Sequence, residues 1–201
     1  YVDALERRQV PHVLMGGRTF HDREEVGALR QALAALEWPD DELAVYATLH
    51  GPFFALNDDA LLAYKDTLGH LSPVRRVEPE ALLGDEQLEA VQAALAVLRR
   101  LHARRNRRAI AETLGDLLAE TRAHASLAFW PSGEQALANI LRVVDHGRRF
   151  DARGTTSFRA FVTWLEGAAD TERGGGNAPI VEEGAEGVRV MTVHKAKGLE
   201  F

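Results

Sequence analysis

The residues best suited to chemistry lie near the carboxyl end of this 201-residue chain, directly after a stretch that is typical of a strand. Residues 188–193 are rich in β-branched and apolar side chains, a pattern that predicts a buried parallel strand. A histidine, two lysines, a glycine and a glutamate follow within residues 194–200. Because ligands of open α/β sheets bind beyond the carboxyl ends of the strands, this segment is a candidate ligand site.

The side chains of this segment suit a nucleotide or nucleic-acid ligand. Gly198 permits close approach of the backbone, and Glu200 offers a carboxylate to a sugar hydroxyl. Four further residues can contact phosphate oxygens: Thr192, His194, Lys195 and Lys197. A charged turn that leaves a strand is the alternative interpretation, because short turns containing lysine and glycine are common.

A second group of candidate residues lies near the other end of the chain. Residues 9–17 predict a short strand that ends in a glycine turn, and Pro11 limits how early it starts. After the turn, Arg18 and Arg23 can reach a phosphate backbone, and Phe20 can pack or stack on a base. A strand, turn and helix with surface arginines is the alternative.

Helices must position these two groups. Asp22 and Glu25 form a capping-box pattern before a helix over about 23–37. A second helix is expected from Asp40 or Asp41 to about His50, and Asn57 is expected to cap a third. Residues 69–84 form a connector.

From Asp85 the apolar spacing is helical throughout, and we expect a helical bundle. A further capping box is expected at Ser132 and Gln135, and Ser157 precedes the last helix. Residues 170–187 are rich in glycine and acids and predict a flexible linker. This order favours a helical domain inserted into an α/β domain, so that the two ends of the chain meet in one sheet.

The bulk composition restricts the class of protein. The chain has no cysteine, which excludes disulfides and thiolate metal sites. No apolar run approaches the ~20 residues that span a membrane, and no signal peptide is visible, so a cytoplasmic location is expected. The net charge of -6 is unusual for a nucleic-acid module, so such contacts must be local. Six arginines within residues 99–108 can bind nucleic acid or a partner, although a solvated face balanced by nearby acids is the favoured interpretation.

Residues 190–201, VMTVHKAKGLEF, are similar almost letter for letter to motif V of UvrD/RecB/AddA-like superfamily 1 DNA helicases. The resemblance implies that Thr192 and His194 lie against single-stranded DNA and that Glu200 reaches the ribose of ATP. Lys197 and Gly198 would shape the turn between these two sites, with Lys197 among the DNA-binding residues and Gly198 beside Glu200 among the ATP-binding residues. Residues 10–26 independently resemble the family segment that contains a glycine turn, an aromatic residue, an arginine and an acidic helix start.

The middle of the chain also resembles this family. Residues 49–61 resemble the start of its inserted 2B domain, and residues 136–141 and 157–166 resemble the RecB/AddA branch. In the UvrD branch, the first of these stretches has a Gly-hydrophobe-Gly turn that contacts duplex DNA. Here the two glycines are replaced by Ala55 and Asn57, which favours the RecB/AddA branch.

The resemblance implies an α/β, predominantly helical fold, with a helical 2B-like insert inside a partial RecA-like parallel-sheet domain of 2A type. The expected divisions are 1–37 (2A-like), 38–169 (2B-like), 170–187 (linker) and 188–201 (return strand and motif V). The chain is expected to be an internal fragment of an ATP-dependent DNA helicase, or of a helicase-nuclease complex, that translocates on single-stranded DNA in recombination or repair.

The cofactors and partners follow from the same resemblance. The full-length protein would use ATP and Mg²⁺ and contact single-stranded and duplex DNA, and a helicase-nuclease partner subunit is a further candidate. The chain has no G-x-x-x-x-G-K-[ST] loop, so it is expected to hold no cofactor and to lack ATPase activity alone. A non-catalytic interaction or regulatory domain on a helicase scaffold is the alternative.

Overall fold

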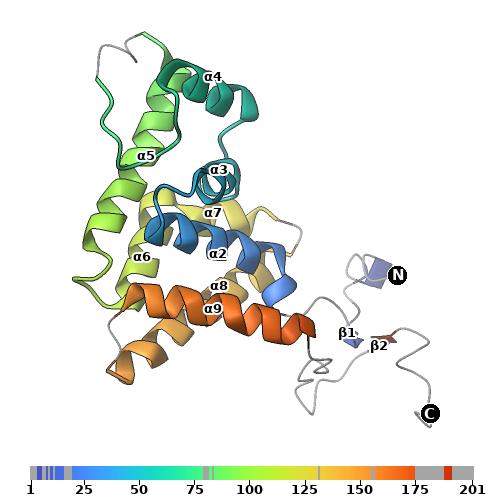
Figure 1. The fold of residues 1–201 in the computed structure, drawn as a ribbon. Coiled ribbons are helices and arrows are strands. Elements are labelled where there is room, and N and C mark those ends of the chain that lie inside the picture. The colour runs from blue at the N-terminus through green and yellow to red at the C-terminus, as the bar shows by residue number, and fades with distance from the viewer. Residues whose placement is uncertain are drawn as a thin grey trace. The chain divides into compact units, whose positions relative to one another are not determined.

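The computed structural model describes residues 4–5, 8, 10, 12–15, 20–78, 82, 84–130, 132–154, 157–174 and 188–191. The chain divides into two compact units, one formed by residues 24–167 and the other by residues 1–23 together with 168–201. Figure 1 shows that the first unit is helical and that the second contains the two strands. Among the described residues, no helix combines the length and the apolar character needed to cross a bilayer.

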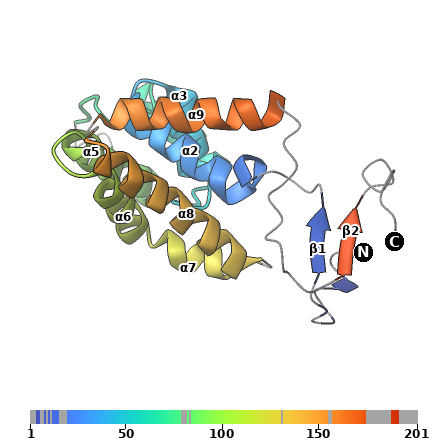
Figure 2. The same ribbon diagram turned by 90° about the horizontal axis from the view of Figure 1, so that it is seen from below.

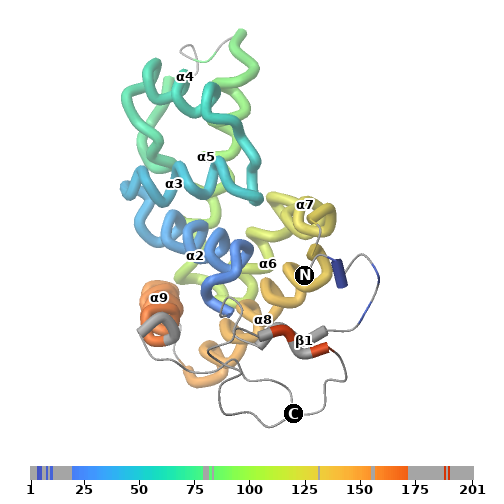
Figure 3. The backbone as a smooth tube through the Cα atoms, turned by 90° about the vertical axis from the view of Figure 1, so that its right-hand side faces the viewer, coloured from blue at the N-terminus to red at the C-terminus, as the bar shows by residue number. Residues whose placement is uncertain are grey.

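The helical unit contains seven complete helices and the start of an eighth within the described residues. Their bounds are α2 (Glu24–Glu37), α3 (Glu42–His50), α4 (Asp58–Leu68), α5 (Glu86–Arg104), α6 (Ile110–Thr121), α7 (Ala123–Ala128), α8 (Gly133–Ala152) and α9 (Phe158–Gly174). Figure 3 follows this path from α2 through α3 and α4 and back along the long α5. The predicted helical architecture of the middle region is confirmed.

The core of the helical unit is formed by the apolar stripes that the sequence predicts. On α2, the stripe residues are almost fully inaccessible: Val26, Leu29, Leu33 and Leu36. On α5, every residue of the predicted seam is buried: Leu88, Val91, Leu95, Leu98 and Leu101. Burial of each such side chain stabilises the fold by about 1.5–3 kcal/mol relative to exposure, so these stripes dominate the packing of the bundle.

Side-chain caps explain where three of the helices begin. Asp41 accepts hydrogen bonds from two backbone N–H groups of α3. Asn57 Oδ1 accepts one from the Ala60 N–H at 2.8 Å, and Asp85 Oδ1 accepts from the first turn of α5. These bonds satisfy donors that a helix N-terminus otherwise leaves unpaired. The predicted starts of α3, α4 and α5 are thus confirmed.

Two of the predicted capping boxes take a different form. Ser132 precedes α8 but makes no side-chain cap bond, and Gln135 instead donates to Asn139. The α7–α8 turn is tight, because a Cβ at Gly133 would lie 2.6 Å from the Ala128 carbonyl oxygen. Glu25, expected to pair with Asp22 in a cap, is buried and accepts a hydrogen bond from Asn139 Nδ2 at 2.6 Å. A tertiary contact thus occupies Glu25, whereas a bond within α8 itself occupies Gln135.

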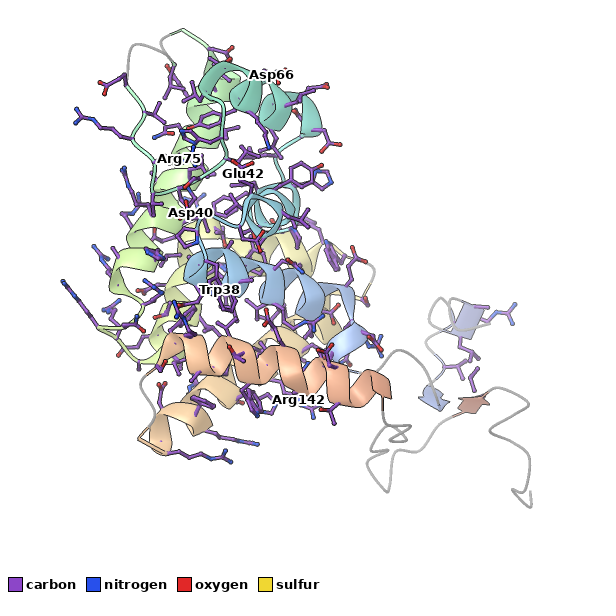
Figure 4. The ribbon with its side chains drawn as sticks, viewed as in Figure 1. Trp38, Asp40, Glu42, Asp66, Arg75 and Arg142 are labelled. Atoms are coloured by element: carbon purple, nitrogen blue, oxygen red, sulfur yellow. The ribbon has the colours of Figure 1, made fainter. Side chains whose placement is uncertain are left out.

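The expected connector over 69–84 begins as a well-packed segment. His70, Leu71 and Ser72 are buried. The Ser72 hydroxyl donates to Asp40, and the Leu71 N–H donates to Glu42. Figure 4 labels Asp40 and Glu42, which belong to the turn into α3 and its first residue. The segment therefore folds back on the start of α3.

Two expected boundaries differ from the structure. α9 continues to Gly174, so residues 170–174, assigned to the linker, are helical; residues 175–187 lie outside the described part. The structure also groups α2 with the helical unit, whereas the sequence placed residues 1–37 in the α/β domain. The assignment of the two units to 2A-like and 2B-like domains stays a prediction.

The second unit contains the two described strands, β1 (His12–Met15) and β2 (Val188–Met191), and the short 3₁₀ helix η1 (Phe20–Asp22). The strands pair in parallel, with His12 opposite Val188 and Met15 opposite Met191. Figure 2 shows the two arrows side by side and pointing the same way. Segments near the two ends of the chain therefore meet in one sheet, while a RecA-like domain around them stays a prediction.

Candidate nucleic-acid and nucleotide site

The candidate site is the carboxyl edge of the β1–β2 pair. Because the strands are parallel and Met15 lies opposite Met191, the chain leaves both strands at the same edge. The residues expected to contact nucleic acid or ATP follow these strand ends in the sequence. Such an edge is where open α/β sheets bind ligands.

Most of the predicted site residues lie outside the described part of the chain. This applies to Arg18 after β1 and to the predicted motif V residues after β2: Thr192, His194, Lys195, Lys197, Gly198 and Glu200. Their roles stay predictions.

Phe20 and Arg23 are the two predicted site residues that the structure describes. Phe20 opens η1, is partly exposed and packs edge-to-face against His21, with ring centroids 5.0 Å apart. Arg23 lies between η1 and α2 and is also partly exposed. Glu24 is exposed at the first position of α2, where the positive end of the helix dipole stabilises a carboxylate. The partial exposure of Phe20 and Arg23 is compatible with ligand contact and with a structural role.

The strongest charged cluster in the helical unit surrounds Glu37, at the end of α2. Its two carboxylate oxygens accept hydrogen bonds from Arg105 Nε and Arg159 Nε, each at 2.7 Å. The Glu37 side chain is 2% exposed, whereas that of Arg159 is 66% exposed. We call these three residues the Glu37 junction; it connects the ends of α2 and α5 with the start of α9.

The junction is completed by bonds to the backbone. Arg105 also donates to the His102 carbonyl oxygen at 2.6 Å, and His102 Nδ1 lies 2.7 Å from the Leu36 carbonyl oxygen. Burial alone raises the pKa of Glu37, but the hydrogen bonds and positive charges of Arg105 and Arg159 outweigh it and hold the pKa below its ordinary value. The carboxylate is therefore ionised at neutral pH and acts in structure.

Three of the six arginines in the segment at 99–108 pair with acids, which agrees in part with the favoured interpretation. Arg100 pairs with Glu120, and Arg108 pairs with Glu112 and Asp116. Arg105 belongs to the Glu37 junction. Half of the cluster is thus engaged in intramolecular pairs, which weakens the case for nucleic-acid binding there.

The stretch expected to begin the 2B-like insert contains a backbone feature that sequence reasoning missed. Ala55 has φ +52°, in the left-handed region that favours glycine. Asn57, at the second replaced glycine, caps α4 through its side chain. The turn therefore has a conformation at Ala55 that favours glycine, and the Asn57 side chain caps α4.

The described residues contain no group of three or more His, Cys, Asp or Glu side chains arranged to hold a metal ion. The residues expected near ATP, Gly198 and Glu200, are outside the described part. The described side chains thus identify no ligand set for Mg²⁺.

Comparison with known proteins extends the resemblance to the whole chain. No family model matches it. It is 27% identical to the AddA-type ATP-dependent helicase/nuclease subunit of Anoxybacillus flavithermus, and 26% identical to its counterparts from Acetivibrio thermocellus and Geobacillus kaustophilus. Each match covers 100% of this chain but only 16–17% of the relative.

The chain is thus similar to one part of UvrD/RecB/AddA-like superfamily 1 helicases, as residues 190–201 indicated. Within that class, the relatives that it matches along its whole length are helicase/nuclease subunits of AddA type.

Proposed function

We propose that this chain is part of an ATP-dependent DNA helicase, specifically of a helicase-nuclease complex, that translocates on single-stranded DNA in recombination or repair. The observation that carries the proposal is the sequence of residues 190–201, which begins in a strand paired in parallel with β1. The names of the relatives support the same class of activity.

In this proposal, the second unit and the helical unit correspond to parts of the 2A-like and 2B-like domains. Thr192 and His194 contact single-stranded DNA, and Glu200 binds the ribose of ATP. Lys195 and Lys197 after β2, and Arg18, Phe20 and Arg23 after β1, contribute to DNA contact. Gly198 shapes the turn that separates the nucleotide from the DNA.

The full-length protein couples ATP hydrolysis to movement along the strand. Closure of the motor around ATP would move the DNA contacts at His194 relative to those of the other motor domain, and Mg²⁺ would supply positive charge to the phosphates. The 201-residue chain lacks a phosphate-binding G-x-x-x-x-G-K-[ST] loop. We therefore predict that the purified chain alone does not hydrolyse ATP, and measurable turnover in a pure sample would contradict this.

Two substitutions in the full-length protein test the site. Glu200→Ala should impair ATP use, and His194→Ala should reduce the stimulation of ATPase activity by single-stranded DNA. Glu134→Ala is the matched control, because Glu134 is an exposed glutamate in the first turn of α8. Unaltered activity in both site variants would remove these residues from the site.

A non-catalytic interaction or regulatory domain on a helicase scaffold is the second candidate. It is favoured by the net charge of -6 and by the loss of the Gly-hydrophobe-Gly pattern at Ala55 and Asn57. The full-length gene distinguishes the two: a phosphate-binding loop and an acidic Mg²⁺-binding motif upstream of Tyr1 support the motor, whereas their absence supports the regulatory domain.

A further inference from the structure

One side of α8 carries basic residues at helical spacing. Arg142, His146 and Arg149 on α8, and Arg153 at its C-cap, recur every three or four residues, which places them within an arc of about 60° on an ideal helix. The three arginines are exposed and His146 is partly buried. Figure 4 labels Arg142 of this set. The buried residues of α8, such as Ile140 and Val144, lie on another side of the helix.

An aromatic cluster joins this side of α8 to α9. The Trp164 ring lies 5.5 Å from the His146 ring and 6.0 Å from the Phe150 ring, centroid to centroid. Phe161 stacks on Trp164 at 5.9 Å with an interplanar angle of 27°. Trp164 nevertheless stays 39% exposed, whereas Phe161 is completely buried. We call the four basic residues and Trp164 the α8 face.

The charges of Arg149 and Arg153 on the α8 face are not neutralised by nearby acids. Asp145 lies beside them on α8 but pairs with Arg148. Asp151 is turned away and accepts hydrogen bonds from the start of α6. Within the described residues, the side chains of Arg149 and Arg153 form no hydrogen bond or ion pair. This differs from the three arginines of the 99–108 segment that are paired: Arg100, Arg105 and Arg108.

We propose that the α8 face binds a single strand of nucleic acid, with phosphates at Arg149 and Arg153 and a base stacked on Trp164. Single-strand sites combine cationic side chains that follow the backbone with aromatic rings on which bases stack. Arg149 and Arg153 lie on the helix whose His146 and Phe150 rings pack against the partly exposed Trp164 indole, so unpaired guanidinium groups and an aromatic ring occur on one surface. They provide the local positive surface that nucleic-acid binding by an acidic chain requires. The proposal extends the proposed function of the full-length protein, because motif V assigns none of these residues to DNA.

The test measures fluorescence anisotropy of a labelled oligo-dT of about 16 nucleotides, the upper site size of a single-strand fold, with the purified 201-residue chain. The double variant R149E/R153E should weaken binding at least tenfold. It should also lower the slope of log affinity against log salt by roughly 1.4, since each lost phosphate contact contributes about 0.7 on a single strand. The matched control R99E/R104E introduces the same charge change on exposed arginines of α5.

A second variant separates stacking from charge. Trp164→Ala should weaken binding to oligo-dT several-fold without altering binding to a duplex of equal length, and Trp164→Phe should retain most of the affinity. Circular dichroism should show that each variant is folded. The proposal would be overturned if R149E/R153E and R99E/R104E lost affinity for oligo-dT equally. It would also be overturned if R149E/R153E kept the affinity of the wild type, and a protein partner would then be the occupant of the α8 face. Equal Trp164→Ala effects on both DNA forms would overturn the single-strand assignment.

Because this binding needs no ATP, it is independent of the ATPase test at Glu200. If Glu200→Ala leaves ATPase activity unaltered while R149E/R153E weakens oligo-dT binding, the proposal for motif V has failed and that for the α8 face stands. If Glu200→Ala impairs ATP use while R149E/R153E binds oligo-dT normally, the proposal for the α8 face has failed.

Discussion

The Glu37 junction and the α8 face both use arginines on helices of the same unit, but in opposite ways. At the junction, Arg105 and Arg159 donate to a carboxylate that is 2% exposed. On the α8 face, Arg149 and Arg153 are exposed to solvent without a partner among the described residues. The first arrangement holds helices together, and the second leaves donors available for a ligand.

This difference shows why the number of arginines in a segment is a poor guide to its function. The densest arginine segment, residues 99–108, contains the pairs Arg100–Glu120 and Arg108–Asp116 and contributes Arg105 to the junction. On α8, where arginines are fewer, the side chains of Arg149 and Arg153 have no partner among the described residues. Whether an arginine has an acidic partner within the folded unit therefore indicates more about its role than the number of arginines around it.

The largest expected effect comes from breaking the junction. Glu37→Ala leaves the partly buried Arg105 without its carboxylate, so it should lower the free energy of unfolding by about 3 kcal/mol. Glu120→Ala is the control, because its pair with Arg100 is more exposed and should contribute about 1 kcal/mol or less. Urea unfolding followed by circular dichroism measures both. Similar losses in the two variants would remove the distinction between the junction and the surface pairs.

The pH dependence of this effect has a defined sign. The folded-state pKa of Glu37 is below its ordinary value, so ionised Glu37 stabilises the fold at neutral pH. This contribution is present above the unfolded-state pKa and is lost as pH falls through the lowered folded pKa. The difference in unfolding free energy between wild type and Glu37→Ala should therefore shrink in acid. A difference that grows in acid would contradict the charged junction.

An intermediate effect is expected at Asp151. Its carboxylate on α8 accepts from the Ile110 N–H at 3.0 Å and the Ala111 N–H at 3.2 Å, at the start of α6. Asp151→Ala should lower the free energy of unfolding by about 1–2 kcal/mol through loss of this cap. The control is Asp145→Ala on the same helix, which removes only an exposed pair with Arg148. If Asp145→Ala is equally costly, the cap is not the cause.

The smallest expected effect is an increase in stability, at Ala55. Ala55 has a positive φ, which costs an L-residue about 1 kcal/mol, so Ala55→Gly should raise the free energy of unfolding by up to about 1 kcal/mol. Ala63→Gly, inside α4, should lower it by about the same amount, because glycine disfavours a regular helix. A loss of stability in both variants would show that the left-handed conformation carries no strain.

The sequence predicted the helices because their determinants are local. The stripes on α2 and α5 repeat at the period of the helix, and Asp41, Asn57 and Asp85 lie next to the donors that they cap. The pairing of the chain's ends was also predicted, because a strand-like stretch near each end flanks a long helical region, which is the order of a helical domain inserted into an α/β domain. The helix predictions needed only residues that are close together in the chain.

The remaining features depend on partners that are distant in sequence. Arg159 is 122 residues from Glu37, and Asn139 is 114 residues from Glu25. This second contact explains why the capping box expected at Glu25 took another form. The left-handed Arg122, which separates α6 from α7, has no side-chain signature that predicts it. For the motif V residues, the sequence remains the basis of assignment.

The parallel pairing of β1 with β2 also imposes an order on synthesis. β1 leaves the ribosome before any residue of α2–α9, and its partner strand follows only after all of them. At about 5–20 residues per second, β1 therefore waits on the order of ten seconds for β2. The helical unit is complete at residue 167, about 20 residues before β2, which leaves it roughly 1–4 s to fold before β2 is made. A helical unit rich in local contacts folds within about a few milliseconds, well inside that interval. During translation, the strand pair thus forms only after the helical unit has already folded.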